Sequence, residues 1–323
     1  MAESLPHHTE HSRIVRAPWR AVYDLVADAA RWPAIFGPSV YLRHLERGER
    51  AERFQLWAVT NDEVRNWTSA RVLDRPGRRI RFEQEHSERP VTAMGGDWTF
   101  RPRPDGTTLV VLRHHFTAID DDPSTVRWIT EAVDRNSPTE LDALARIAEL
   151  GCNPEEVVFS FQDSLPVPGS AADAYDFVYR ADLWPQRLPH VGRVALVEDR
   201  PGIQDLRMET VTPDGSSHTT RSVRICFPYE RIAYKQVLVP SLLLGHSGEW
   251  IFTEGTDHAV ITSRHTVVLN PAAFPDVSIA DARERVRAAL VANSETTMGH
   301  AASFAAERRS TEVNAAAPGE GRI

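Results

Sequence analysis

Hydrophobic and polar residues alternate along much of the stretch from residue 40 to residue 118, which is the pattern of strands that bury one face. These segments are rich in β-branched and aromatic residues, and turn sequences such as RPGR and RPDG separate several of them. The pattern predicts about six strands in one antiparallel sheet, at 40–47, 53–61, 66–74, 78–86, 95–103 and 107–118.

A helical period replaces this alternation on both sides of the strands. Residues 19–33 read as a short helix that Trp32 and Pro33 close, because the residue before a proline avoids the helical region. Residues 124–150 predict a long helix, with apolar residues at roughly helical spacing at Val126, Ile129, Val133, Leu141, Leu144 and Ile147.

The same succession of elements occurs twice in the chain. The repeated blocks are YDLVADAARWP and YDFVYRADLWP, GGDWTF and SGEWIF, LRHHF and SRHTV, and RNSPTELDA and ANSETTMGH. They recur in one order at an offset of about 150 residues, which is the size of a whole domain and not of a solenoid repeat. We infer a tandem duplication.

The expected fold is α+β, with two tandem domains in which a curved antiparallel sheet wraps around a long C-terminal helix and leaves an interior cavity. The first domain spans 1–150 and the second 157–310, closed by a helix at 278–308, with 151–157 as the linker. The tail at 311–323 lacks core-forming residues and is expected to be flexible.

Composition narrows the function classes. The 323 residues carry a net charge of −8, which disfavours a broad nucleic-acid-binding surface. No apolar run is long enough for a membrane helix, and the first residues have no signal-peptide core. The two cysteines, Cys152 and Cys226, cannot form a disulfide framework or a zinc cluster. We expect a cytoplasmic protein without metal, cofactor, nucleic-acid or membrane partner.

Alternation along two strands of each copy selects the side chains that face the cavity. In the first copy Trp67, Ser69 and Arg71 share one face, and His114 lies on an otherwise apolar face, so Arg113 and His115 should point outward. The corresponding residues of the second copy are His218, Ser222, Arg224 and His265, and we place His218 where the first copy has Trp67.

A structural interpretation competes with this functional one. A single inward histidine is more often a core residue than a catalyst, and an arginine on a strand is usually solvated. Because both copies carry the same arginine and histidine, a functional polar cavity is favoured. Asn136 and Asn293 are poor helix formers within the long helices, so each either contacts the cavity or bonds the neighbouring backbone.

These blocks resemble the helix-grip domains of the START/Bet v 1-like superfamily, and the pair resembles the di-domain polyketide aromatase/cyclases of bacterial type II polyketide synthases. The resemblance implies catalytic roles for Arg71, His114, Arg224 and His265. It implies a substrate-binding role for a further set: Trp32, Ser39, Trp67, Ser69, Asn136, Trp184, His218, Ser222 and Asn293. Ser39 stands near the position where some members have a tyrosine, and the Trp-Pro turns are expected at the mouth or floor of each cavity.

The implied activity is cofactor-independent aldol cyclisation and dehydration of a ketoreduced poly-β-keto chain carried by an acyl carrier protein, alongside the other type II polyketide synthase components. A confined cavity would supply proximity, an arginine would supply charge, and a histidine would move protons. Two alternatives stay open: a non-catalytic carrier of hydrophobic small molecules, and a protein in which one copy alone is catalytic.

Overall fold

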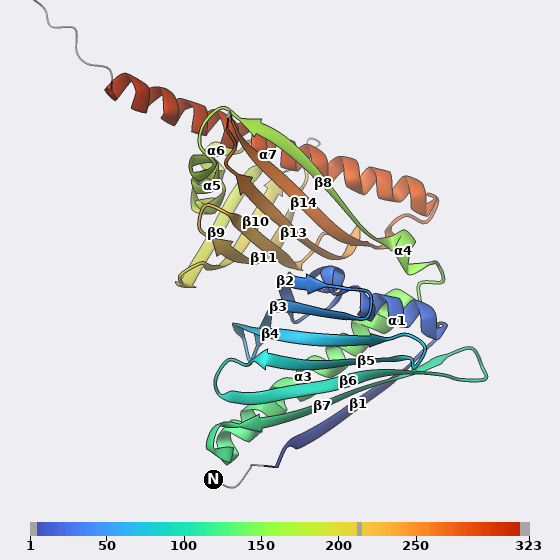
Figure 1. Cartoon of the computed structure of the whole chain (residues 1–323). Helices are drawn as coiled ribbons and strands as arrows, with labels where there is room; N and C mark the ends of the chain where they lie inside the picture. Colours follow the sequence, from blue (N-terminus) through green and yellow to red (C-terminus); the bar gives the residue numbers. More distant parts are fainter. Residues whose placement is uncertain (1–4, 212–214, 257, 317–323) are drawn as a thin grey trace, which may run out of the picture. The chain divides into compact units, whose positions relative to one another are not determined.

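The computed structural model describes residues 5–211, 215–256 and 258–316. The chain divides into two compact units, Met1–Val158 and Phe159–Ile323. Each unit contains one antiparallel seven-stranded sheet and one long helix (Figure 1). This is the predicted α+β architecture.

In the first unit the sheet has the order β1-β7-β6-β5-β4-β3-β2, so the first and last strands of the unit pair with each other. The strands are β1 (His7–Val15), β2 (Ser39–Arg47), β3 (Ala51–Thr60), β4 (Glu63–Asp74), β5 (Arg79–His86), β6 (Val91–Pro102) and β7 (Thr108–Ala118). The helices are α1 (Trp19–Ala27), η1 (Ala29–Arg31), α2 (Trp32–Ile35), η2 (Ile119–Asp121), α3 (Pro123–Ala148) and α4 (Pro154–Val157).

The second unit repeats this topology with the sheet order β8-β14-β13-β12-β11-β10-β9. Its strands are β8 (Val158–Val167), β9 (Val191–Arg200), β10 (Ile203–Val211), β11 (Ser217–Phe227), β12 (Arg231–Leu238), β13 (Leu243–Thr253) and β14 (Ala259–Leu269). Its helices are α5 (Ala171–Tyr179), η3 (Ala181–Leu183), α6 (Trp184–Arg187), η4 (Pro271–Ala273) and α7 (Ile279–Ala316).

The long helix α3 packs its apolar stripe inside the first sheet, where Ile129, Leu141, Leu144 and Ile147 are fully buried. Its first turn begins at Asp122, whose carboxylate accepts a hydrogen bond from the Thr125 backbone N–H. The predicted limits of this helix, 124–150, thus agree closely with the structure. The predicted tail at 311–323 begins within α7, which continues to Ala316, and residues 317–323 lie outside the described ones.

Two expectations about the start of each unit were wrong or incomplete. Strands β1 and β8 were not foreseen. The sequence of β1 is a run of polar residues that ends in Ile14 and Val15 and lacks an apolar alternation. The Trp-Pro pair does not close the first helix. Trp32 is itself helical and begins α2, where Pro33 lies in the first turn and its missing N–H removes no helical hydrogen bond.

Candidate functional site

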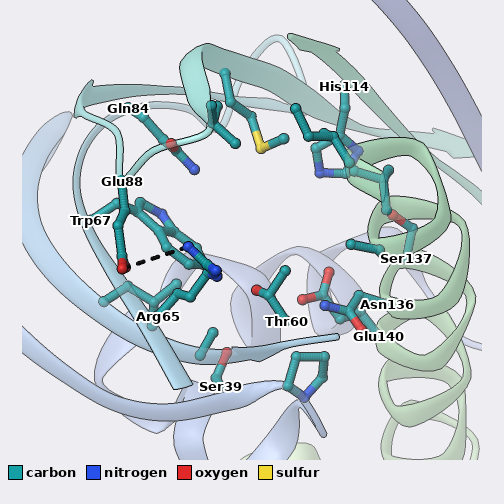
Figure 2. A pocket seen from close by; sticks show the side chains of 18 of the residues that line it. Ser39, Thr60, Arg65, Trp67, Gln84, Glu88, His114, Asn136, Ser137 and Glu140 are labelled. Atoms are coloured by element: carbon teal, nitrogen blue, oxygen red, sulfur yellow. Dashed lines mark ion pairs between the residues drawn. The ribbon is translucent and has the colours of Figure 1, made fainter. Parts of the chain in front are cut away.

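The concave face of the first sheet and helix α3 enclose two hollows, of about 130 and about 100 Å³, that share several lining side chains, Trp67 and His114 among them. Figure 2 shows the first of them. We call them together the N-terminal cavity. Every site residue predicted for this unit lines it: Trp32, Ser39, Trp67, Ser69, Arg71, His114 and Asn136. Arg113 and His115 point away and pair with Glu10 and Glu83, as the alternation predicts.

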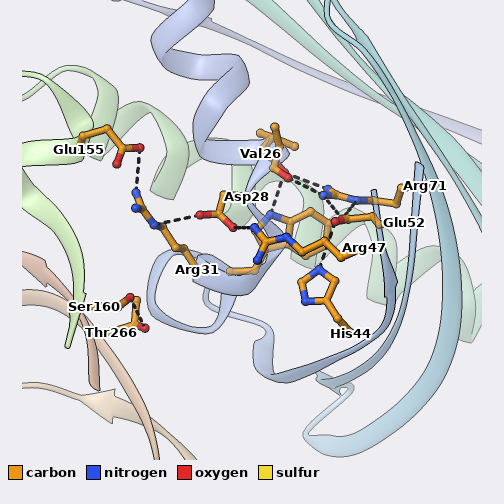
Figure 3. Close-up of polar contacts among 12 residues, drawn as sticks. Val26, Asp28, Arg31, His44, Arg47, Glu52, Arg71, Glu155, Ser160 and Thr266 are labelled. Carbon is orange, nitrogen blue, oxygen red and sulfur yellow. Dashed lines mark hydrogen bonds and ion pairs between the residues drawn. The ribbon is translucent and has the colours of Figure 1, made fainter. Parts of the chain in front are cut away.

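Arg71 is 1% exposed and is held on several sides (Figure 3). Its Nε donates to Glu52 Oε1 at 2.8 Å, and its two terminal nitrogens donate to the Val26 and Ala27 carbonyls at 2.9 and 2.8 Å. The guanidinium also lies 4.5 Å from the centre of the Trp32 ring. Arg71 therefore satisfies the free carbonyls at the end of α1, and its charge is balanced by a buried carboxylate.

Glu52 is ionised because its partners outweigh its burial. Burial raises the pKa of the Glu52 carboxyl, but hydrogen bonds from His44 and the charge of Arg71 bring that pKa below its ordinary value. His44 Nε2 lies 3.1 Å from Glu52 Oε2. No pattern in the sequence indicated this contact, since Glu52 reads as a polar residue at the start of a strand.

His114 points into the N-terminal cavity from β7, edge-on to the ring of Phe82. Burial lowers the pKa of His114 to about 3, so its imidazole is neutral at physiological pH. Its Nδ1 atom is buried without a hydrogen-bond partner among the described residues. A buried nitrogen with an unused hydrogen-bonding capacity is suited to contact a ligand in the cavity.

A carboxyl group that was not predicted also faces this cavity. Glu140 lies on α3 one turn after Asn136 and lines both hollows. Burial raises the pKa of Glu140 to about 8. The spacing of four residues from Asn136 places both on one helix face and could have revealed Glu140.

The second unit encloses a cavity of about 140 Å³, here called the C-terminal cavity. All six residues predicted for this unit line it: Trp184, His218, Ser222, Arg224, His265 and Asn293. Its volume is close to that of the larger N-terminal hollow, so the chemistry of the walls separates the two units more clearly than this volume does.

Arg224 is 2% exposed and, like Arg71, donates to the end of a helix, in this case to the Val178 carbonyl at 2.7 Å. Its Nη1 atom is buried without a hydrogen-bond partner, and no carboxylate lies within ion-pair distance of it, among the described residues. Burial lowers the pKa of the Arg224 guanidinium, which nonetheless stays protonated because arginine is so basic. Arg224 is a buried cation without a counter-ion at contact distance.

Cross-strand pairing shows why the two arginines differ. Arg71 lies opposite Glu52 on β3 and β4, whereas Arg224 lies opposite Gln204 on β10 and β11. The side-chain amide of Gln204 donates instead to the exposed Glu198, at 2.7 Å. The Glu198 carboxylate therefore contacts the neutral amide of Gln204 and not the guanidinium of Arg224.

The same pairing corrects one prediction about the repeat. Trp67 lies opposite Leu56 two residues before Ser69, and Thr220 lies opposite Met208 two residues before Ser222. Thr220, and not His218, is thus the counterpart of Trp67. His218 corresponds instead to Arg65.

His265 is the centre of a buried hydrogen-bond network in the C-terminal cavity. Its Nε2 lies 2.8 Å from Ser294 Oγ, and its Nδ1 lies 3.0 Å from His246 Nε2 and 3.2 Å from the Tyr234 hydroxyl. The Ser294 hydroxyl donates its hydrogen to the Leu290 carbonyl at 2.7 Å, so its oxygen accepts a hydrogen bond from His265 Nε2–H. The Ser263 hydroxyl lies 3.0 Å from the same nitrogen. With the proton on Nε2, the Nδ1 lone pair faces Tyr234 and His246.

Burial sets the protonation of this network. It lowers the pKa of His265 to about 4 and that of His246 well below its ordinary value, so both rings are neutral. It raises the pKa of the Tyr234 hydroxyl, although the positive charge of Arg224 acts in the opposite direction. Tyr234 and His246 were not predicted as site residues, and their positions in the first unit are held by Phe82 and Met94, whereas Ser294 corresponds to Ser137.

The described residues contain no group of three His, Cys, Asp or Glu side chains placed to hold a metal ion. No helix in the described ranges is long and apolar enough to cross a membrane.

Comparison with known families bears on both units. Residues 6–149 match a family described as polyketide cyclase/dehydrase and lipid transport, and residues 167–294 match a second family model with the same description. The chain belongs to the polyketide cyclase/dehydrase family. The tandem repeat inferred from the sequence is therefore a repeat of this family domain.

Relatives of this polyketide cyclase/dehydrase match across nearly its whole length. The granaticin polyketide synthase bifunctional cyclase/dehydratase of Streptomyces violaceoruber is 51% identical and covers 93% of this chain and 94% of its own. The actinorhodin polyketide synthase bifunctional cyclase/dehydratase of Streptomyces coelicolor is 46% identical, with coverages of 93% and 97%.

Two solved structures of di-domain proteins match both units of this chain. The di-domain ARO/CYC BexL of the BE-7585A pathway is 48% identical with a TM-score of 0.76, and covers 93% of this chain and 98% of its own. The di-domain ARO/CYC StfQ of the steffimycin pathway is 37% identical with a TM-score of 0.74, and covers 94% and 99%. The predicted fold class is confirmed, and these relatives support an aromatase/cyclase over a non-catalytic carrier.

Proposed function

We propose that this protein closes and aromatises the first ring of a poly-β-keto chain, which an acyl carrier protein delivers after reduction by a ketoreductase. It would do so in the cytoplasm, as a component of a type II polyketide synthase. The names of the full-length relatives support the polyketide synthase context and the two activities, cyclisation and dehydration. Each step needs a confined chain and a charge partner, but no redox cofactor.

The observation that carries this proposal is the state of Arg224. A buried cation without a contacting carboxylate, with one nitrogen unpartnered, is arranged to meet a negative charge that develops in the cavity. In an intramolecular aldol reaction that charge appears first on the enolate oxygen and then on the alkoxide oxygen. A low-dielectric cavity strengthens the attraction and requires little reorganisation when the charge appears.

The network around His265 provides the proton transfers of the same reaction. The Nδ1 lone pair of the neutral ring takes a proton from a methylene between two carbonyls, and Arg224 holds the enolate oxygen. The methylene carbon then bonds to a ketone carbon, whose π electrons move to oxygen. The proton returns from His265 to that oxygen, with the Tyr234 hydroxyl, 3.2 Å from Nδ1, as a second donor.

The N-terminal cavity is less suited to this step. Arg71 already balances Glu52, so its contact with a new anion would have to compete with a buried ion pair. We propose that Arg71 shapes this cavity by holding α1 to β4, and that the walls bind the chain. The proposed binding residues are those predicted from the sequence: Trp32, Ser39, Trp67, Ser69 and Asn136, with Trp184, His218, Ser222 and Asn293 in the other cavity.

The test is reconstitution with a minimal polyketide synthase and a ketoreductase, with products identified by mass spectrometry. Arg224→Gln keeps a polar side chain at this position but removes the charge, and should slow first-ring closure about a hundredfold. Arg221→Gln is the matched control, because Arg221 lies on the same strand, points outward and pairs with Asp205. Ring closure by Arg224→Gln at the wild-type rate, with folding unchanged, would refute this assignment of the charge.

A further inference from the structure

Glu140 occupies a position in the N-terminal cavity that no other carboxyl group in the described walls of either cavity shares. It projects from α3 toward the space between the helix and the sheet, beside Asn136 and Thr60 (Figure 2). Among the described residues its carboxyl group has no hydrogen-bond or ion-pair partner. It also lines both hollows, so a ligand in either one would lie beside it.

The charged groups around this cavity are already engaged with other partners. Arg65 on β4 donates to Glu63 at 2.9 Å and to the Arg89 carbonyl at 2.8 Å, and its guanidinium lies 3.6 Å from Glu88. Arg71 is balanced by Glu52, and His114 on β7 is a neutral imidazole. Without a free cation nearby, burial raises the pKa of Glu140 to about 8, and the group is a neutral acid at physiological pH.

The second unit has no equivalent group. Asn136 and Ser137 correspond to Asn293 and Ser294, which places Thr297 at the position of Glu140. Thr297 also lines its cavity, and its hydroxyl donates to the Asn293 carbonyl at 3.0 Å. No aspartate or glutamate is found among the described residues that line the C-terminal cavity.

We propose that Glu140 is the acid–base catalyst of the dehydration step and that this step takes place in the N-terminal cavity. This inference rests on the proposed function and divides it: the cationic C-terminal cavity closes the ring, and the cavity that holds a carboxylic acid removes water. The chemical class of its ligand is a cyclised β-hydroxy ketone.

The step balances on a single carboxyl group. One oxygen of Glu140 takes the proton from the carbon next to the ketone, and the C–H electron pair becomes the new carbon–carbon double bond. The C–O bond to the hydroxyl breaks, and the leaving oxygen takes the proton from the other oxygen of Glu140 and departs as water. Glu140 ends as the neutral acid with which it began, so no other proton donor is needed.

The test uses the full-length protein in the reconstituted system and measures two products: the aromatic ring, and its cyclised precursor that is heavier by one water. Glu140→Gln preserves the shape but cannot exchange protons. It should lower dehydration about a hundredfold while ring closure continues, so the hydrated precursor accumulates. Glu131→Gln, an exposed position on the same helix, is the matched control and should leave the ratio unchanged.

A pH profile separates catalysis from a structural role. Wild-type dehydration should decline as pH rises through about 8, when Glu140 loses its proton, and this decline should be absent from the residual rate of Glu140→Gln. If Glu140→Gln folds poorly, Glu140→Thr takes its place, because the second unit has threonine at this position. Aromatic product formed by either folded variant at the wild-type rate would overturn the inference. Failure of the wild-type protein to close the ring would instead overturn the proposed function.

Discussion

Gln204 lies directly opposite Arg224 on the paired strands β10 and β11, so a buried guanidinium has a neutral amide as its cross-strand neighbour. At the equivalent place in the first unit the neighbour is a carboxylate, Glu52. One difference of side chain thus leaves an arginine without a contacting counter-ion in one cavity and a balanced ion pair in the other. This offers a physical route by which a duplicated domain can take on two steps of one reaction sequence.

The first prediction exchanges two side chains of the second unit. Gln204→Glu combined with Glu198→Gln moves the carboxylate next to Arg224 and keeps an amide–carboxylate hydrogen bond between the two positions. The total charge does not change. Because the new ion pair competes with the enolate for the guanidinium, ring closure should slow on the order of tenfold. The measurement is the rate of cyclised product, and an unchanged rate in a folded exchange variant would show that the charge of Arg224 is not used.

The second prediction concerns stability in the first unit. Glu52→Gln leaves Arg71 buried without its counter-ion and should cost about 3 kcal/mol in the free energy of unfolding, measured by denaturant titration. Glu85→Gln is the control, because Glu85 pairs with Arg53 at the surface and should matter little. Equal losses in the two variants would mean that the Arg71–Glu52 pair contributes no more than a surface pair.

The inward-facing residues of each cavity could be predicted because a strand offers a two-residue period and the chain repeats it. Arg71 and His114, with their counterparts Arg224 and His265, all face the interior, as alternation requires. Alternation acts within one strand, however, and does not say which residue of a neighbouring strand lies opposite. The pairing of Glu52 with Arg71 depends on the register of β3 against β4, which the sequence pattern alone does not fix.

Other residues were missed for local reasons. Strand β1 has few apolar side chains and joins the sheet through its backbone pairing with β7. Its own composition therefore does not reveal it as a strand. Glu140 was overlooked because a glutamate on a helix is ordinarily a solvated residue. Only the curvature of the sheet around α3 turns that helix face toward a cavity.

The third prediction concerns acid. His114 and His265 are neutral in the folded protein, with pKa values of about 3 and about 4, whereas unfolded histidine titrates near 6.5. Folded-state pKa values that are depressed in this way mean that the unfolded chain binds more protons, so stability is lost as pH falls from about 6.5 toward 4. Each histidine contributes up to about 1.4 kcal/mol per pH unit in that window.

The measurement is the free energy of unfolding between pH 7 and pH 4, compared between variants. His265→Gln should flatten the dependence, whereas His258→Gln, at an exposed position, should leave it as it is. A wild-type slope in the His265→Gln protein would show that the ring is already protonated in the folded state.

The last prediction tests the Tyr234 hydroxyl through a neighbouring backbone position. A Cβ added at Gly248 would lie 2.4 Å from the Tyr234 hydroxyl oxygen and 2.5 Å from the Arg264 carbonyl oxygen, so Gly248→Ala must displace the phenol from His265. If that hydroxyl donates a proton during ring closure, Gly248→Ala and Tyr234→Phe should both slow closure by roughly tenfold or more. Gly96→Ala is the matched control, because its Cβ would meet the Phe82 ring and the Arg113 carbonyl, and Phe82 has no hydroxyl where the second unit has Tyr234. It should lower stability without slowing ring closure. Slow closure in Gly248→Ala together with a wild-type rate in Tyr234→Phe would mean that the backbone shift matters and the hydroxyl does not, which would remove Tyr234 from the proton-transfer network.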